Sequence, residues 1–183
     1  LGAAAPWKDE GREIGFLCTV PGYDRHFTVC ESLGIRMHPI PLGEDGPDLA
    51  AAEAAVAADP GIKGIWCVPK YSNPTGITYS DAVVRRLAEL PRRAGPGFRV
   101  LWDNAYAVHD LDEDPPVLAS LMAAADAAGT ADAMALFAST SKITFAGAGV
   151  AFLGASEATL QAFAARLGTL MIGWDKVNQL RHA

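Results

Sequence analysis

Residues 137–150 read Phe-Ala-Ser-Thr-Ser-Lys-Ile-Thr-Phe-Ala-Gly-Ala-Gly-Val, and they continue the apolar run that begins at residue 133. Lys142 therefore stands just after a segment with the length and composition of a buried strand. An ammonium group in such a place is costly unless it is paired, neutralised or used covalently, and a lysine amine can condense with an aldehyde. The alternative is a surface lysine in a loop between a strand and a helix, and this stretch alone leaves both interpretations open.

On both sides of this stretch, apolar runs of strand length alternate with segments of helical periodicity. The expected strands are residues 14–20, 35–42, 62–68, 98–102, 133–137 and 150–153. The expected helices are residues 23–33, 49–58, 81–90, 117–128, 157–167 and 175–182. Runs that are apolar throughout indicate strands that are covered on both faces. The sequence therefore predicts an α/β fold, a mostly parallel sheet with helices on both faces.

Local signals mark where the helices begin and end. Asp48 and Ser80 precede helical segments and are expected to cap them, whereas Gly34 and Gly129 follow helical segments as left-handed terminators. In the first helix, apolar residues recur at i, i+4, i+7 and i+10, and this face is expected to be buried. Its members are Tyr23, Phe27, Cys30 and Leu33.

The composition argues against several classes of protein. Half of the residues are hydrophobic, yet no apolar run is long enough to cross a bilayer, and residues 1–10 lack the pattern of a signal peptide. The net charge of −6 argues against a nucleic-acid surface and favours a small-molecule partner. Cys18, Cys30 and Cys67 are odd in number and have no metal-ligand spacing, and the histidines are scattered. We therefore expect structural thiols, no metal site and a reducing cytoplasm.

Polar side chains follow three of the expected strands. Asn73 opens an Asn-Pro-Thr-Gly sequence after the strand at 62–68, Asp103 and Tyr106 follow the strand at 98–102, and Ser139 and Lys142 follow the strand at 133–137. Singly, they have ordinary explanations as turn, cap or half-buried aromatic residues. Because ligands bind at the carboxyl ends of parallel strands, neighbouring strands would bring the amide, carboxylate, phenol and amine into one crevice.

Together, the Asn-Pro-Thr-Gly, Asp-x-Ala-Tyr and Ser-x-Ser-Lys motifs resemble those of the pyridoxal-phosphate-dependent aminotransferases of fold type I, classes I and II. Residues 21–27 and 141–149 are most similar to a bacterial aspartate-aminotransferase-like branch. The resemblance extends over nearly the whole chain from residue 21. It implies that the α/β sheet is the central part of the large domain of such an enzyme, with pyridoxal 5′-phosphate as cofactor.

The resemblance also implies catalytic roles. Lys142 would form a Schiff base with the cofactor and then carry a proton between the substrate and the cofactor. Asp103 would keep the pyridine nitrogen protonated, so that the ring accepts electrons. Asn73 and Tyr106 would donate hydrogen bonds to the phenolic oxygen of the ring.

Further residues are implied as cofactor-binding. Tyr23 would stack on the ring, and Ser139 and Ser141 would donate to the phosphate, while the Asn73–Pro74 bond would be cis. The arginine that many members carry beyond the lysine as a phosphate partner is absent from residues 143–150. The glycines there could let backbone amides approach the phosphate instead.

The family's glycine-rich phosphate loop and its small domain have no counterpart in this sequence. We therefore expect residues 1–183 to be a partial cofactor-binding large domain of a longer enzyme, inactive alone if the missing parts are essential. The expected reaction is transamination, with aspartate and 2-oxoglutarate as the favoured pair, by a cytoplasmic homodimer without nucleic-acid or membrane partners.

Three alternatives stay open at this point. The same cofactor residues would serve another fold type I chemistry, such as that of a C–S lyase or a decarboxylase. An aminotransferase-like domain can also act as the cofactor sensor of a transcription regulator. The third alternative is a structural fragment that binds nothing.

Overall fold

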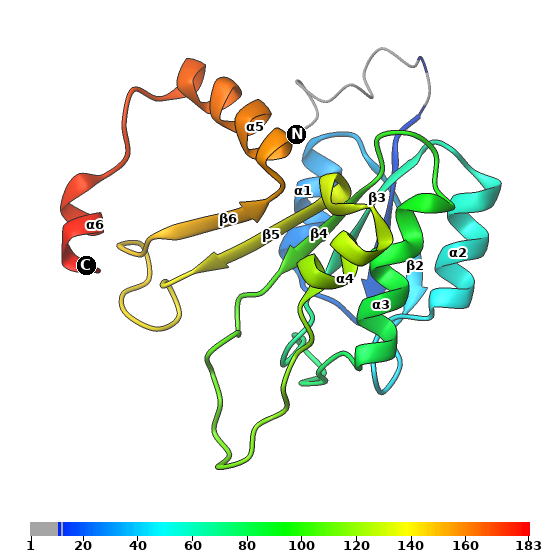
Figure 1. Ribbon diagram of the computed structural model, residues 1–183, viewed down its shortest axis with the longest axis horizontal. Helices are drawn as coiled ribbons and strands as arrows, with labels where there is room; N and C mark the ends of the chain where they lie inside the picture. The colour runs from blue at the N-terminus through cyan, green and yellow to red at the C-terminus, as the bar shows by residue number, and fades with distance from the viewer. Residues whose placement is uncertain (1–10, 12) are drawn as a thin grey trace.

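The computed structural model describes residue 11 and residues 13–183, and a six-stranded sheet forms its centre (Figure 1). The strands are β1 (Gly15–Val20), β2 (Arg36–Pro41), β3 (Ile62–Cys67), β4 (Arg99–Asp103), β5 (Met134–Ser139) and β6 (Ala151–Ala155). They lie in the order β2-β1-β3-β4-β5-β6, and every neighbouring pair is parallel except β5 and β6. The predicted mostly parallel sheet is confirmed, with β6 as an antiparallel edge strand.

Helices connect the strands. They are α1 (Asp24–Ser32), α2 (Leu49–Ala58), α3 (Asp81–Glu89), α4 (Leu121–Ala128), α5 (Glu157–Leu170) and α6 (Lys176–Arg181), with short 3₁₀ turns at Leu90–Arg92 and Ala131–Ala133. The predicted caps are confirmed, because Asp48 accepts a hydrogen bond from the backbone N–H of Ala51 at 3.0 Å and Ser80 accepts one from Val83 at 3.3 Å.

Helices cover both faces of the sheet, as predicted. Leu17 and Ile65 belong to a core shared with α2, α3 and α4, whereas the adjacent Phe16 and Trp66 belong to a second core that includes Cys30 of α1. Side chains of a strand point alternately to its two faces, so strands covered on both sides are apolar without interruption. All three cysteines are free and buried, and Cys18 and Cys67 lie within the strands as expected.

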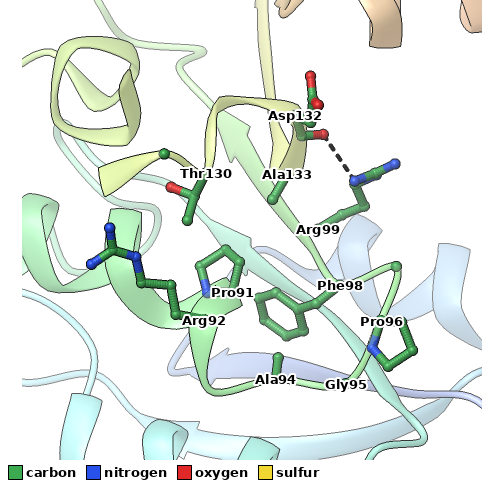
Figure 2. Close-up of a pocket in the computed structure, with 12 residues that line it drawn as sticks. Pro91, Arg92, Ala94, Gly95, Pro96, Phe98, Arg99, Thr130, Asp132 and Ala133 are labelled. Carbon is green, nitrogen blue, oxygen red and sulfur yellow. Dashed lines mark hydrogen bonds between the residues drawn. The ribbon is translucent and has the colours of Figure 1, made fainter. Parts of the chain in front are cut away.

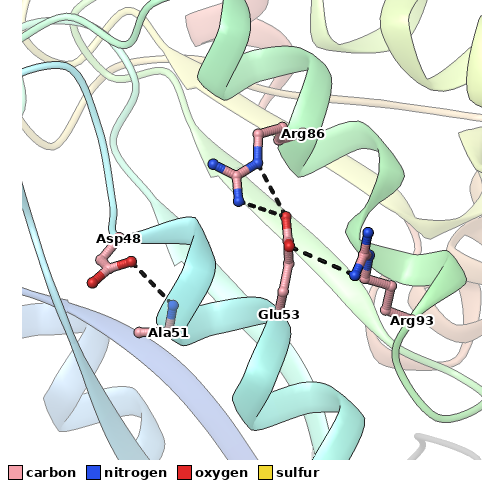
Figure 3. A network of polar contacts seen from close by, with 5 residues as sticks. All are labelled: Asp48, Ala51, Glu53, Arg86 and Arg93. Carbon is pink, nitrogen blue, oxygen red and sulfur yellow. Dashed lines mark hydrogen bonds and ion pairs between the residues drawn. The ribbon is translucent and has the colours of Figure 1, made fainter.

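An ion-pair network ties the first two helices of the larger core together (Figure 3). The Glu53 carboxylate of α2 accepts hydrogen bonds from Arg86 of α3 at 2.9 and 3.1 Å, and Arg93 lies 3.7 Å away. Both arginines are exposed, so solvent screens these pairs.

Two expectations about helices were wrong in detail. The helix predicted at 117–128 begins only at Leu121, because Ser120 accepts a hydrogen bond from the backbone N–H of Ala123 and caps it there. In α1, Leu33 is 39% exposed and His26 is buried in its stead. The buried face of α1 is therefore shifted, because a polar partner for His26 lies beneath the helix.

Candidate active site

The carboxyl ends of β3, β4 and β5 meet at one edge of the sheet, since these strands are neighbours. The ends of these strands and the segments that follow them bring Asn73, Asp103, Tyr106 and Lys142 to the wall of one small hollow of about 10 Å³. Tyr23, which follows β1, also lines it, so five of the seven predicted site residues meet there. The lining residues are Tyr23, Val68, Asn73, Asp103, Ala105, Tyr106 and Lys142. An amine, a carboxylate, an amide and two phenols from distant parts of the chain thus share one place.

The Lys142 amine lies against two aromatic rings. Its Nζ atom is 4.8 Å from the ring centroid of Tyr106 and 5.9 Å from that of Tyr23, within the range of cation–π attraction. The expectation of a buried strand end was wrong, because β5 is only half-buried beyond Met134 and Lys142 is exposed. Contact with solvent explains how an ammonium group is accommodated here without a carboxylate partner within the described residues.

Asp103, the last residue of β4, has a partner that the sequence analysis missed. His26 of α1 donates a hydrogen bond from Nε2 to Oδ2 of Asp103 at 3.0 Å, and the histidine is only 7% exposed. Its ring stacks on Trp66 of β3, with the centroids 4.3 Å apart and the planes 8° from parallel. The position of His26 one helical turn after Tyr23 is a weak signal for this role.

Asn73 and Tyr106 form a pair across two loops. The side-chain amide of Asn73 donates to the phenolic oxygen of Tyr106 over a long 3.5 Å, and the Asn73–Pro74 peptide bond is cis, as the resemblance implies. The rings of Tyr106 and His109 form a T-shaped pair, with 5.5 Å between the centroids and 78° between the planes. Two hydrogen-bonding groups thus lie next to each other at the wall of the hollow.

Ser139 and Ser141 lie beside Lys142 but do not line the hollow. The backbone N–H of Ser141 faces the hydroxyl of Ser139 at 3.4 Å. A β-carbon built on Gly149 would lie 2.6 Å from the Ser141 hydroxyl oxygen, so this position accommodates no larger side chain without movement. Apart from Lys142, loop 140–150 therefore offers hydroxyls and close backbone, and it contains no second cation.

A larger hollow of about 330 Å³ lies at the opposite edge, near the amino ends of β4 and β5 (Figure 2). The guanidinium groups of Arg92 and Arg99 stand on opposite sides of Phe98 and point away from each other. Each donates to a backbone carbonyl, Arg92 to Ala128 and Arg99 to residue 132 at 2.8 Å. Because its polar groups do not converge, this hollow is the weaker candidate.

Residues 11 and 13–183 contain no group of histidine, cysteine and acidic side chains that could hold a metal ion. Within the same residues, the helices are too short or too polar to span a membrane.

Comparisons with known proteins agree with the geometry. The sequence profile of the family described as aspartate amino-transferase matches residues 1–183. A Mycolicibacterium smegmatis protein named as an aminotransferase is 54% identical over 100% of this chain and 42% of its own length. An aspartate aminotransferase of Corynebacterium glutamicum is 46% identical over 97% of this chain and 40% of its own.

Solved structures give the same result. The crystal structure of an aspartate transaminase from Corynebacterium glutamicum has a TM-score of 0.90 and 45% identity, covering 97% of this chain and 41% of that one. The chain thus spans less than half the length of the relatives it matches. From the profile match over its whole length, the chain belongs to the aspartate amino-transferase family.

Proposed function

We propose that this chain is the central part of the large domain of a pyridoxal-5′-phosphate-dependent aminotransferase. The enzyme would move an amino group between an amino acid, with aspartate favoured, and a 2-oxo acid, with 2-oxoglutarate favoured. The observation that carries the proposal is the convergence of Lys142 with Asn73, Asp103 and Tyr106 on one hollow. An aldehyde-bearing pyridine needs this donor set, namely an amine, a carboxylate for its nitrogen and donors for its ring oxygen.

Lys142 is the residue that would bind the cofactor covalently. Its amine would hold the aldehyde carbon, with loss of one water molecule, and once substrate has replaced it the free amine would take the proton from the α-carbon. When bound, the cofactor supplies a ring that accepts the electrons left behind by that proton. Lys142 is suited to both tasks because a flexible four-carbon stem lets its amine move between positions.

Asp103 would hold a proton at the pyridine nitrogen. One of its oxygens accepts the hydrogen bond from His26 at 3.0 Å, and the other has no hydrogen-bond partner within residues 11 and 13–183. A carboxylate fixed on one side in this way presents its second oxygen in a defined direction. The His26 ring, stacked on Trp66, would keep that direction constant.

The remaining residues would orient the cofactor. Asn73 and Tyr106 would donate to the ring oxygen, and Tyr23 would lie against a ring face. Ser139 and Ser141 would donate to the phosphate, together with backbone N–H groups of loop 140–150. The hollow admits a pyridine ring only if the Lys142 side chain moves from the Tyr106 ring, and an exposed lysine can make that movement.

The favoured substrates rest on the relatives. A protein named as an aspartate aminotransferase is 46% identical, whereas a Thermus thermophilus protein named as a 2-aminoadipate transaminase is 32% identical over 84% of this chain. We expect the parts of the enzyme that correspond to the rest of its relatives to contain residues that select the substrate and to complete a cytoplasmic homodimer. Light scattering of the full-length protein would test the dimer.

The cofactor is tested by an absorbance spectrum of the full-length protein with added pyridoxal 5′-phosphate. We expect a band in the visible or near-ultraviolet that Lys142→Ala abolishes. Lys176→Ala, which changes an exposed lysine of α6, is the matched control and should keep the band. A band that survives in Lys142→Ala would remove Lys142 from the proposed role.

The reaction is tested with labelled aspartate and 2-oxoglutarate. We expect the label in nitrogen to appear in glutamate, with oxaloacetate as the other product. Labelled ammonia with fumarate would identify an elimination, and carbon dioxide with labelled alanine would identify a decarboxylation; either result without labelled glutamate would refute transamination.

A further inference from the structure

A polar cluster outside the predicted site joins the two loops that carry Asn73 and Tyr106. Lys70 donates to Oδ1 of Asp110 at 2.6 Å, and the Tyr71 hydroxyl donates to the same oxygen at 2.7 Å. We call Lys70, Tyr71 and Asp110 the Lys70 cluster. Lys70 is only 7% exposed, so its charge depends on these partners.

The cluster lies close along the chain to the candidate site. Lys70 precedes Asn73 by three residues and also faces the carbonyl oxygen of Ala107 at 3.4 Å, which is the residue after Tyr106. The pair it flanks, Asn73 and Tyr106, is itself held only by the long 3.5 Å contact. The charged bonds of the cluster join the same two loops and are much shorter than this contact.

Loop 104–120 needs such an anchor. It contains no helix or strand, and Figure 1 shows it as a long excursion that leaves the end of β4 and returns to α4. Leu111 is 97% exposed and Val117 is 87% exposed, so little apolar burial holds the outer part of the loop. A loop of this length without packing has large conformational freedom, which bonds at its base reduce.

The backbone at Tyr71 shows that the loop after β3 is also constrained. Tyr71 has a φ of +49°, a left-handed conformation that is unfavourable for a residue other than glycine. Such conformations persist where surrounding contacts enforce them, and they are frequent at functional sites. Here the enforcing contacts are the bond to Asp110 and the Lys70 amine 5.2 Å from the Tyr71 ring centroid.

We propose that Lys70, Tyr71 and Asp110 are positioning residues that hold Asn73 and Tyr106 at the spacing at which both donate to one cofactor oxygen. This inference rests on the proposed function, because it concerns the same site. Without the cluster, loop 104–120 moves away from Asn73 and the donors no longer meet at that oxygen. With fewer hydrogen-bond donors, the negative charge on the ring oxygen is less stable. The Lys142 nitrogen, once joined to the cofactor, would therefore keep its proton to a higher pH.

The test uses the full-length protein loaded with pyridoxal 5′-phosphate and the variants Lys70→Met, Asp110→Asn and Tyr71→Phe. We measure the pH midpoint of the cofactor absorbance change and the dissociation constant of the cofactor. Lys70→Met and Asp110→Asn should raise the midpoint by about 0.5 pH or more and weaken cofactor binding about 5- to 50-fold, as expected for a lost charged bond of roughly 1–2 kcal/mol. Tyr71→Phe, which keeps the ring and loses one bond, should give a smaller change in the same direction.

Glu53→Gln is the matched control, because it breaks the ion-pair network of Figure 3 on the helices of the larger core. It should leave both the midpoint and the cofactor affinity at wild-type values. Limited proteolysis of the cofactor-free protein adds a readout that is independent of the cofactor. Asp110→Asn should be cleaved faster than the wild type within residues 104–120, whereas Glu53→Gln should be cleaved at the wild-type rate.

The outcomes separate the two proposals. A wild-type protein that gives no cofactor band would refute the proposed function. A wild-type protein with the band, together with cluster variants that titrate and bind as wild type does, would refute the positioning role alone. Equal shifts in Glu53→Gln and Asp110→Asn would also overturn it, since they would indicate a general loss of stability.

Discussion

Replacing His26 by phenylalanine or by glutamine would separate its two contacts. Phenylalanine keeps a ring that can stack on Trp66 but removes the hydrogen bond to Asp103, which is 3.0 Å long. Glutamine keeps an N–H donor near the position of Nε2 but removes the stack. A hydrogen bond to a charged group contributes about 1.5–3 kcal/mol, whereas an aromatic pair contributes about 0.5–1.5 kcal/mol.

These magnitudes predict that the two variants differ in their turnover. If the bond to Asp103 acts in the reacting state, His26→Phe should lower kcat/KM about 10- to 100-fold, since about 1.4 kcal/mol corresponds to a factor of ten. His26→Gln should remain within a few-fold of the wild type while the free energy of unfolding falls by about 0.5–1.5 kcal/mol.

The assay is turnover of aspartate with 2-oxoglutarate by the full-length protein, with denaturant unfolding of the same samples. The reasoning requires His26→Phe to be slower than His26→Gln. Near-normal turnover of His26→Phe at saturating cofactor would refute it, because Asp103 would then need no fixed partner.

Three other perturbations test the fold and the Lys70 cluster, all by denaturant unfolding. Ser80→Ala removes the cap of α3 and a 2.9 Å bond to Asp45, so we expect a loss of about 0.5–2 kcal/mol. Gly64→Ala places a β-carbon 2.7 Å from the buried Phe16 ring, so we expect a loss of about 1–3 kcal/mol, and an unchanged stability would mean that this core yields easily. The bond from Tyr71 to Asp110 raises the pKa of Tyr71 to about 12, from an ordinary value of 10.0. Stability from this bond should therefore be present below pH 10 and disappear between about pH 10 and 12, and Tyr71→Phe should abolish that part of the pH dependence. The bond from Lys70 holds the pKa of the Asp110 carboxyl below its ordinary value of 3.8. The stability that this pair contributes should therefore be present above pH 3.8 and be lost as the pH falls through the lowered pKa.

Sequence patterns correctly predicted which polar residues gather at the carboxyl ends of the strands. Continuous apolar runs defined β3, β4 and β5, and the polar residues after them, including Asn73, Asp103 and Lys142, meet as expected. The prediction succeeded because parallel strands place their carboxyl ends at one edge of the sheet, independently of the conformation of the loops.

Contacts between distant segments could not be predicted in the same way. His26 is bonded to a residue 77 positions away, and Lys70 to one 40 positions away, so no local period reveals either pair. The start of α4 also depends on a single hydroxyl, that of Ser120, which competes with the apolar periodicity before it. Loop conformations and helix ends depend on hydrogen bonds of individual side chains, and the hydrophobic pattern carries no information about these bonds.

The residues of the candidate site are held with unequal strength, and the difference matches their proposed tasks. Asp103 is fixed by a short bond to the buried His26, and loop 104–120 is fixed by the 2.6 Å pair of Lys70 and Asp110. Lys142, by contrast, has neither a hydrogen bond nor an ion pair within the described residues, and its amine lies over the rings of Tyr23 and Tyr106. A cation–π contact at an exposed place contributes about 0.5–1 kcal/mol, less than a charged hydrogen bond. An amine that must bind an aldehyde, leave it and then carry a proton needs this freedom, whereas the groups that orient the ring need to stay in place.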